Sequence, residues 1–157
     1  MSKRIVLGSL GFVATVFSLA WLFWPSDEER ILTLFEELSE VASKTEDASA
    51  LADAMVVKDF KELFAPEVTI SIRSKARIAG DRSNQELAQL YGRLRIASRR
   101  MGLRHEQLEI LSIEDERASV GVWFFASWIG KGGNVVREEA HSEVELIKVE
   151  GDWKVSQ

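Results

Sequence analysis

The sequence predicts an α+β domain in which a curved, mostly antiparallel sheet wraps around three helices, preceded by one transmembrane helix. Residues 119–129 are rich in β-branched and aromatic side chains, a glycine-rich break follows at 130–134, and residues 135–149 resume the strand pattern. A second break at 150–152 leads into a short closing strand at 153–155. The chain therefore ends as a meander, and the segments before it must cover one face of that sheet.

The amino-acid composition limits the size and the chemistry. The 157 residues have room for one domain of ordinary size and an anchor. No cysteine is present, so disulfides, thiolate metal sites and a cysteine nucleophile are excluded. The histidines, His105 and His141, are too few for a histidine-based metal cage, and no phosphate-binding loop or nucleophile motif is found. We predict no cofactor and no metal site.

The N-terminus carries the strongest single signal. Residues 5–24 form an uncharged, mostly apolar run, and a helix of about 20 residues crosses a hydrocarbon core of about 30 Å. Lys3 and Arg4 precede this run and three acidic residues follow it at 27–29. The positive-inside rule therefore places the tail, residues 1–4, in the cytoplasm and the domain, residues 26–157, outside. A cleaved signal peptide with a site at 18–20 is the competing interpretation.

Three helices are predicted from capping signals and apolar stripes. Residues 26–29 and 83–86 both have the form S-x-x-E, a capping box that supplies partners for free N–H groups at a helix start. A further helix begins near Ser49. Apolar side chains recur at helical spacing in all three, and each stripe is expected to be buried. The stripes are Ile31, Leu34, Phe35, Leu38 and Val41 or Ala42; Leu51, Met55, Val56, Phe60, Leu63 and Phe64; and Leu87, Leu90, Tyr91, Leu94, Ala97 and Met101.

The remaining strands are shorter. Residues 68–73 alternate with period two, residues 76–79 form a second short strand, and residues 108–113 form a third. His105 falls in the loop before this third strand. With the hairpin and the closing strand, the predicted order is anchor, two helices, two strands, one helix and four strands.

Three segments of the chain resemble the nuclear transport factor 2-like (NTF2-like) superfamily, which includes SnoaL-like and ketosteroid-isomerase-like proteins. These are FKELFAPEVTI at 60–70, Ala79-Gly80 before a capped helix, and EGDWKV at 150–155. The resemblance implies a cystatin-like cone, with a pocket at its wide end and dimers that commonly form through the outer sheet face. It implies no single function, because members of the superfamily include isomerases, cyclases, ligand binders and scaffolds.

One face of the predicted hairpin is almost wholly apolar and is expected to be the inner face of the cone. It carries Val120, Val122, Phe124, Ala126 and Trp128 with Val136, Glu138, Ala140, Ser142, Val144 and Leu146, provided that no bulge changes the register. The residues expected to line the pocket are Val122, Phe124, Trp128, Glu138 and Tyr91.

Glu138 is the one candidate for acid–base catalysis, because a carboxyl group in an apolar pocket is poised to exchange a proton. The alternative is that Glu138 reaches solvent at the strand end. A ketosteroid-isomerase-like site also needs a tyrosine and a protonated aspartate. The single tyrosine, Tyr91, lies on an apolar helix stripe, and no strand offers the aspartate.

The outer face of the hairpin is expected to be an interface. Trp123, Phe125 and Ile129 form an apolar patch there, and such patches usually mark contact surfaces. The alternative is that the long side chains of neighbouring residues cover the aromatic rings. His141 lies on the same face among glutamates, which is typical of a solvated strand.

Charge is uneven along the chain. Residues 73–104 contain nine basic and two acidic residues, whereas residues 25–157 as a whole have a net charge of −7. Arg95 and Arg99 would repel each other at i,i+4 unless an anion is near. The expected partners of this basic stretch are acidic groups of the chain or of a dimer mate, or anionic lipid headgroups. The acidic total does not favour nucleic acid.

These patterns predict a membrane-anchored binding or assembly module without catalysis. The resemblance suggests the bacterial inner membrane, with the N-terminus in the cytoplasm and the domain in the periplasm, and a homodimer or an envelope-protein partner on the outer sheet face. The alternative is a SnoaL-like or ketosteroid-isomerase-like enzyme, or a carrier, which takes a small apolar ligand in the cone pocket.

Overall fold

The computed structural model describes residues 25–46, 48–70 and 80–157. The chain divides into two compact units, Met1–Arg30 and Ile31–Gln157. The expected anchor at 5–24 and the expected strand at 76–79 lie outside the described residues. Within the described ranges, no helix combines the length and the apolar character needed to cross a membrane.

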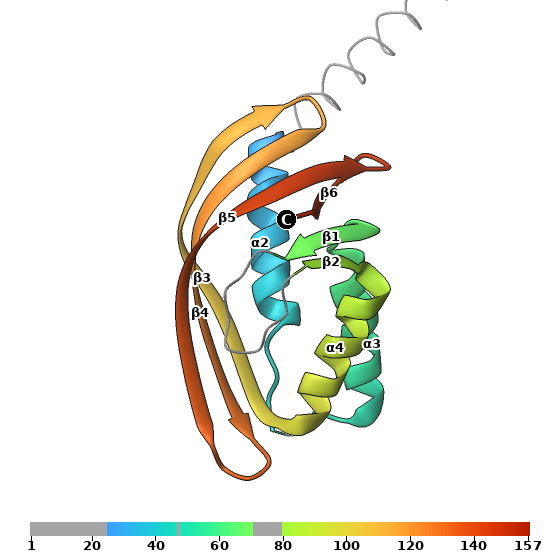
Figure 1. Cartoon of the computed structure of the whole chain (residues 1–157), viewed down its shortest axis with the longest axis vertical. Helices are drawn as coiled ribbons and strands as arrows, with labels where there is room; N and C mark the ends of the chain where they lie inside the picture. Colours follow the sequence, from blue (N-terminus) through green and yellow to red (C-terminus); the bar gives the residue numbers. More distant parts are fainter. Residues whose placement is uncertain (1–24, 47, 71–79) are drawn as a thin grey trace, which may run out of the picture. The chain divides into compact units, whose positions relative to one another are not determined.

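Within the described ranges the helices and strands follow the predicted order, except that the strand at Gly80–Ser83 was not predicted. They are α2 (Asp27–Val41), α3 (Ala50–Glu62), β1 (Glu67–Ile70), β2 (Gly80–Ser83), α4 (Asn84–Ala97), β3 (Ser98–Glu114), β4 (Arg117–Gly130), β5 (Val135–Val149) and β6 (Asp152–Val155). The last four strands form one antiparallel sheet in the order β3-β4-β5-β6, and β1 pairs with β2 in a separate two-stranded sheet. The fold is α+β, with three helices against a curved antiparallel sheet (Figure 1).

Both predicted capping boxes are confirmed. The Glu29 N–H donates to the Ser26 hydroxyl at 3.2 Å and the Ser26 N–H donates to the Glu29 carboxylate at 3.0 Å. Ser83 and Glu86 repeat this exchange at the start of α4. The hydrogen bond from the Ser83 backbone N–H lowers the pKa of Glu86 below its ordinary value, because it stabilises the charged carboxylate.

Strand β3 is longer than the sequence pattern indicates. The third helix was expected to extend to Met101 and the next strand to begin at 108, but α4 ends at Ala97 and β3 begins at Ser98. The sequence of residues 98–107 lacks the alternation of polar and apolar side chains that is typical of a half-buried strand. This segment forms a strand because it pairs with β4. His105, expected in a loop, pairs with Phe124 inside the sheet.

The curvature of the sheet has a local cause in β3. The register of β3 against β4 shifts at three places, between Ser98 and Arg100, Glu106 and Glu109, and Ile110 and Ser112. Gln107, within the second shift, has a backbone φ of 50°, a conformation rare for a residue other than glycine. Such bulges bend and twist a strand. Strands β4 and β5 pair without any shift.

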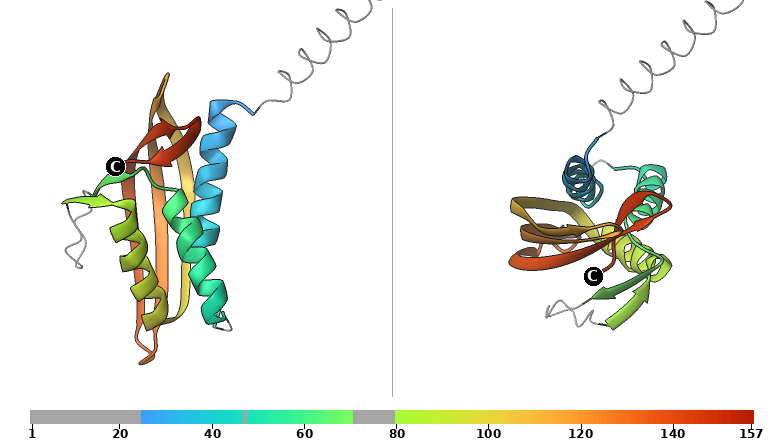
Figure 2. Two further views of the ribbon diagram at one scale, coloured as in Figure 1. Left: turned by 90° about the vertical axis from the view of Figure 1, so that its right-hand side faces the viewer. Right: turned by 90° about the horizontal axis from the view of Figure 1, so that it is seen from above.

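The core lies between α2 and the concave face of the sheet (Figures 1 and 2). Apolar side chains of α2, the inner faces of β4 and β5, and the closing strand β6 form one buried cluster. Its members are Ile31, Leu34, Phe35, Leu38, Leu63, Ala118, Val120, Val122, Val144, Leu146, Trp153 and Val155. The segment after α3 joins β6 through hydrogen bonds between Leu63, Ala65 and Val155, so the predicted closing strand completes the core.

Helix α3 is less buried than its sequence stripe predicts. Leu51 and Met55 are 74% and 62% exposed, and no residue of α3 is fully buried. The side of α3 that faces α4 carries Phe60, whose ring stacks on Tyr91 with centroids 4.0 Å apart. Val57 lies on the same side of α3. A Cβ atom added at Gly92 of α4 would be 3.4 Å from the Val57 side chain. The apolar stripe predicted for α3 therefore includes two residues, Leu51 and Met55, that are exposed in the structure.

Candidate functional site

The hairpin has the register that the sequence predicts. Trp128 pairs with Val136, Ala126 with Glu138 and Val122 with Ser142, without an intervening bulge. Since side chains alternate across a strand, the even-numbered residues of both strands share one face and the odd-numbered ones the other. Val120 and Val122 are buried in the core, which identifies the even-numbered face as the inner one.

The expected pocket residues on this inner face have different environments. Val122 is fully buried, and Phe124 packs against Phe35 with ring centroids 6.1 Å apart. Trp128 is half-buried, whereas Glu138 is exposed to solvent. The candidate acid–base residue therefore lies on the predicted face but is not enclosed by apolar side chains, and its position fits the solvated alternative.

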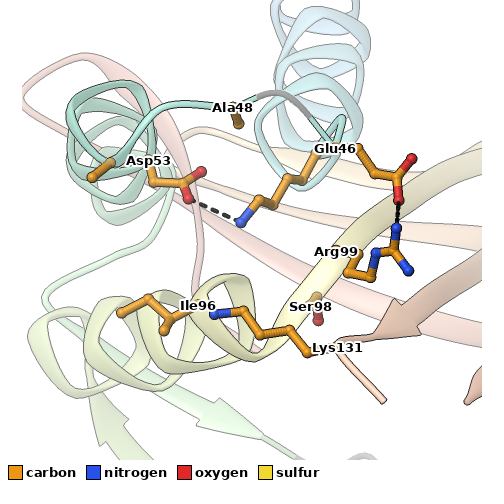
Figure 3. Close-up of a pocket in the computed structure, with 9 residues that line it drawn as sticks. Glu46, Ala48, Asp53, Ile96, Ser98, Arg99 and Lys131 are labelled. Atoms are coloured by element: carbon orange, nitrogen blue, oxygen red, sulfur yellow. Dashed lines mark hydrogen bonds and ion pairs between the residues drawn. The ribbon is translucent and has the colours of Figure 1, made fainter. Parts of the chain in front are cut away.

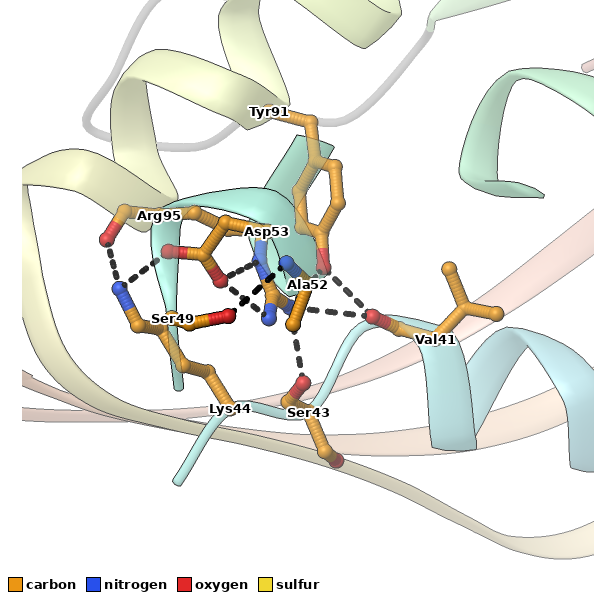
Figure 4. Close-up of polar contacts among 8 residues, drawn as sticks. All are labelled: Val41, Ser43, Lys44, Ser49, Ala52, Asp53, Tyr91 and Arg95. Carbon is orange, nitrogen blue, oxygen red and sulfur yellow. Dashed lines mark hydrogen bonds and ion pairs between the residues drawn. The ribbon is translucent and has the colours of Figure 1, made fainter. Parts of the chain in front are cut away.

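The fifth expected pocket residue, Tyr91, belongs to a buried polar cluster between the helices (Figure 4). Its hydroxyl donates to the Val41 carbonyl at the end of α2 and accepts a hydrogen bond of 2.6 Å from Arg95 Nη1. Arg95 is only 3% exposed. We call Lys44, Asp53, Tyr91 and Arg95 the polar cluster. Because the Tyr91 hydroxyl already donates its hydrogen to the Val41 carbonyl, it is not free to donate a hydrogen bond to an oxyanion.

Asp53 is the acceptor at the centre of the polar cluster. Arg95 Nε and Nη2 donate to Asp53 Oδ1 at 3.0 and 2.8 Å, and Lys44 Nζ donates to Oδ2 at 2.9 Å. Desolvation favours the neutral acid, but the hydrogen bonds from Lys44 and Arg95 outweigh it and hold the pKa of Asp53 below its ordinary value. Burial raises the pKa of Tyr91 above its ordinary value, against the opposing effect of Arg95.

The sequence did not indicate that Arg95 is buried. A usable signal was present, because Arg95 follows Tyr91 by four residues and so shares its helix face. The predicted repulsion between Arg95 and Arg99 is relieved by separate carboxylates. Arg95 pairs with Asp53 at 2.8 Å, and Arg99 pairs with Glu46 at 2.8 Å. For these two arginines the partners are acidic groups of the chain itself, one of the predicted possibilities.

A hollow of about 620 Å³ adjoins the polar cluster (Figure 3). Both charged and apolar side chains surround it. It is lined by Lys44, Glu46, Ala48, Ala50, Asp53, Ile96, Ser98, Arg99 and Lys131. These residues come from the segment between α2 and α3, the start of α3, the end of α4, the start of β3 and the turn after β4, and we call this site the α3–α4 hollow. No sequence pattern indicates this hollow.

The outer face of the sheet holds the expected interface residues. Trp123 packs on His141 with ring centroids 5.1 Å apart, and the Arg104 guanidinium lies 4.7 Å from the centre of the Phe125 ring. Trp123, Phe125 and Ile129 are half-buried. Neighbouring side chains therefore cover part of this patch, as the alternative interpretation supposed.

A second hollow, of about 570 Å³, lies beside Phe125. By register, most of its lining side chains belong to the outer face, including Arg104, Ser127, Arg137 and Glu139. Gly102 contributes no side chain, and a Cβ there would lie 3.2 Å from Ser127 Oγ. The missing side chain helps to form this outer-face hollow.

His105 has a partner that the sequence did not reveal. Its Nδ1 lies 2.9 Å from the Ser39 hydroxyl of α2, and its ring packs near Phe35 with centroids 6.0 Å apart. The described part of the chain contains no group of three or more histidine and acidic residues arranged to hold a metal ion.

The element order, the curved sheet and the helices on its concave side are those of the cystatin-like cone fold, which is also the fold of NTF2-like proteins. A protein from Kribbella flavida has a TM-score of 0.66 at 13% identity, over 83% of this chain and 86% of that one. A protein with a cystatin-like fold from Caulobacter vibrioides has a TM-score of 0.57 at 12% identity, over 82% and 83% of the two chains.

A protein of unknown function from Nostoc punctiforme, also with a cystatin-like fold, has a TM-score of 0.55 at 16% identity, over 82% of this chain and 85% of that one. No protein-family model and no curated protein sequence matches the chain. At these identities the likeness shows the fold and no specific function.

Asp53→Ala tests the polar cluster. We expect it to lower the free energy of unfolding at pH 7 by about 3–5 kcal/mol, because it leaves the buried Arg95 without its carboxylate. The pKa of Asp53 is lowered in the folded state. The carboxylate therefore makes its full contribution to the free energy of unfolding at pH values above the ordinary Asp pKa of 3.8, and this contribution is lost as pH falls through the folded-state pKa. Urea unfolding of the full chain in neutral detergent, followed by circular dichroism, measures both effects.

Glu62→Ala is the matched control for this prediction. Glu62 pairs with Lys58 at 3.6 Å, and both side chains are largely exposed, so we expect a loss below about 1 kcal/mol. Equal losses for the two variants would contradict the importance of the polar cluster.

Proposed function

We propose that this domain is an assembly module without catalysis, which pairs with a second copy of the chain through the outer face of β3, β4 and β5. The observation that carries the proposal is the position of three aromatic and aliphatic side chains, Trp123, Phe125 and Ile129, on a sheet face that no described helix covers. In Figure 2 all three helices lie on the other side of the sheet.

Charge on the outer face supports pairing with an identical copy. A two-fold interface brings the same surface of both subunits together, so it must be self-complementary. Arg104 and Arg137 lie beside Glu106 and Glu139 on this face, and Arg104 pairs with Glu106 at 3.0 Å. A patch with both signs of charge around aromatic rings satisfies that condition. The outer-face hollow offers space for a side chain of the partner.

The proposal includes the placement of the domain. Residues 5–24 hold it at a bacterial inner membrane, with residues 1–4 in the cytoplasm and the domain in the periplasm. The apolar run and the charges on either side of it support this placement.

A carrier for a small apolar ligand in the cone is the second candidate. One observation favours it: on the inner face, Trp128 is only half-buried and Ala140 is exposed, so part of the apolar face is open. An enzyme that acts on such a ligand has less support than a carrier. Glu138 is exposed, and the Tyr91 hydroxyl is engaged by Val41 and Arg95.

Trp123→Glu tests the assembly proposal. It places a charge in the centre of the expected interface, and we expect the full chain in neutral detergent to change from a dimer to a monomer in sedimentation analysis. Leu51→Glu is the control, because Leu51 is 74% exposed on α3, away from the sheet. A monomeric natural chain, or a dimer that Trp123→Glu leaves intact, would contradict the proposal.

Alkaline extraction of membranes tests the anchor. A helix that spans the bilayer stays in the membrane when peripheral proteins are released, so we expect the full-length chain to remain in the membrane pellet. Replacing Leu10 and Val13 with Arg should release the chain, because charges at the bilayer centre oppose insertion. Release of the natural chain would show that residues 5–24 do not span.

The carrier alternative predicts a fluorescence response. A small apolar ligand that enters the cone should change the tryptophan emission of the full chain, and Trp128→Phe should remove most of that change. Five tryptophans contribute to the signal, so the comparison with the variant is essential. An unchanged response in Trp128→Phe would exclude a ligand beside this residue.

A further inference from the structure

We propose that the open edge of strand β5, residues 135–144, pairs with the same edge of a second copy of the chain. The two strands run antiparallel about a two-fold axis at Ala140, so the sheets of both copies form one continuous sheet. This contact uses backbone groups at the border of the sheet, and it does not depend on the outer-face contact of the proposed function. A chain with two self-complementary surfaces can form assemblies larger than a dimer.

Within the described sheet, only one end of β5 has a neighbour on both sides. Strand β4 pairs along almost the whole of β5, whereas β6 pairs with it only over residues 146–149 (Figure 1). Ser156 and Gln157 add backbone hydrogen bonds to Glu145. Among the residues that the structure describes, none pairs with the other side of residues 135–144. Most side chains of this segment are exposed, so a second strand can reach it.

The backbone groups of this edge alternate in direction. The N–H and C=O of Glu145 bond to the C-terminal residues, on the side away from β4, whereas the Lys148 N–H donates to the Glu116 carbonyl in the turn before β4. The N–H and C=O groups of successive residues point to opposite sides of a strand, and β4 and β5 pair without a shift. The odd-numbered residues therefore present their N–H and C=O groups at the open edge. Within the exposed segment these residues are Arg137, Glu139, His141 and Glu143.

Charge selects one register for two identical strands at this edge. Backbone hydrogen bonds form only if odd-numbered residues of one copy lie opposite odd-numbered residues of the other. With the two-fold axis at Ala140, Glu139 lies opposite His141 of the second copy. In the same register, Arg137 lies opposite Glu143 of the second copy. Opposite charges that face each other across two strands stabilise the pair, and a histidine ring N–H can donate to a carboxylate.

The side chains on the inner face also match. Glu138 lies opposite Ser142 of the second copy, whose hydroxyl can donate to the carboxylate. Ala140 lies opposite its own copy, in a pair without backbone hydrogen bonds, where two strands approach most closely and a small side chain fits. Glu143 can still accept a hydrogen bond, because Ser119 donates only to its Oε1 atom, at 2.8 Å. Every glutamate of residues 137–143 thus faces a donor.

The neighbouring registers bring like charges together. A two-fold axis at Glu138 or at Glu139 places that carboxylate opposite its own copy. An axis at His141 places Glu139 opposite Glu143 of the second copy. Like charges directly opposite each other destabilise a strand pair. The register centred on Ala140 is therefore the one that the charges favour.

The contact is short, and interfaces of small area are weak and transient. We therefore expect the pair to form at high protein concentration. At the low concentrations of sedimentation analysis, the outer-face contact alone decides the oligomeric state. A covalent trap is the suitable test, because it accumulates a pair that forms only briefly.

Ala140→Cys provides that trap. The natural chain has no cysteine, so this variant carries a single thiol. The Cα atoms of such a strand pair lie about 4.5 Å apart, within the range that a disulfide spans. We expect the full chain in neutral detergent, treated with copper phenanthroline and air, to form a covalent dimer on a non-reducing gel. Position 140 lies on the inner face of the sheet, so the outer-face contact cannot bring two such thiols together.

Glu138→Cys is the matched control. Glu138 is exposed and lies on the same strand and the same face as Ala140. In the proposed register, however, two thiols at position 138 are roughly 13 Å apart along the paired strands. We expect Ala140→Cys to cross-link faster than Glu138→Cys by about tenfold or more, because a disulfide cannot span that separation. Chance encounters within a micelle affect both variants alike.

Charge reversal in the Ala140→Cys chain tests the register. Arg137→Glu and Glu143→Arg each place like charges opposite each other, so each should slow cross-linking several-fold. Both changes together restore opposite charges and should recover most of the rate. Arg93→Glu reverses an exposed charge on α4 and should leave the rate unaltered. Circular dichroism shows whether each variant is folded.

Three results would overturn the proposal. The first is that Ala140→Cys cross-links no faster than Glu138→Cys. The second is that the folded double reversal is as slow as the single reversals. The third is that, in membranes, Ala140→Cys forms a mixed disulfide with a different protein and no dimer of the chain. A dimer that Trp123→Glu disrupts in sedimentation is compatible with each of these results, so failure here and failure of the assembly proposal are distinguishable.

Discussion

The buried guanidinium of Arg95 is the interaction on which the arrangement of the helices depends. It donates to the carbonyl of Val41, the last residue of α2, and to the Ser43 carbonyl beyond it. It also donates to the Asp53 carboxylate of α3 and to the Tyr91 hydroxyl of its own helix. The planar group of an arginine offers several donors in fixed directions, which suits it to such a junction better than lysine. One side chain thus satisfies the carbonyls at the end of a helix and fixes where two further helices lie.

The same interaction forms one side of the α3–α4 hollow. Lys44 and Arg95 share the Asp53 carboxylate there, and Lys44 and Asp53 both line the hollow. The outer sheet face is different in kind, because Arg104 and Glu106 already pair there and the ring of Phe125 lies under a guanidinium.

The sequence predicts the parts of this fold that depend on local patterns. The order of elements, the capping boxes at Ser26 and Ser83, and the register of β4 with β5 all follow from spacing within a short stretch. The parts that depend on distant segments were not predicted. Residues 98–107 are a strand because β4 supplies their hydrogen bonds, and Arg95 is buried because Asp53, 42 positions away, is its partner. The α3–α4 hollow combines five segments and has no local signature.

The bulges in β3 also bear on how the sheet behaves toward other chains. In the described sheet β3 is an edge strand, and a straight edge offers free backbone N–H and C=O groups to any extended polypeptide. The shifts around Gln107 and Ile110 interrupt that row, and Arg100, Arg104 and Glu109 add charge along it. At the other end, Lys44 pairs with Met101 and occupies part of the edge. The irregularity that bends the sheet thus also protects it from continuous strand addition and aggregation.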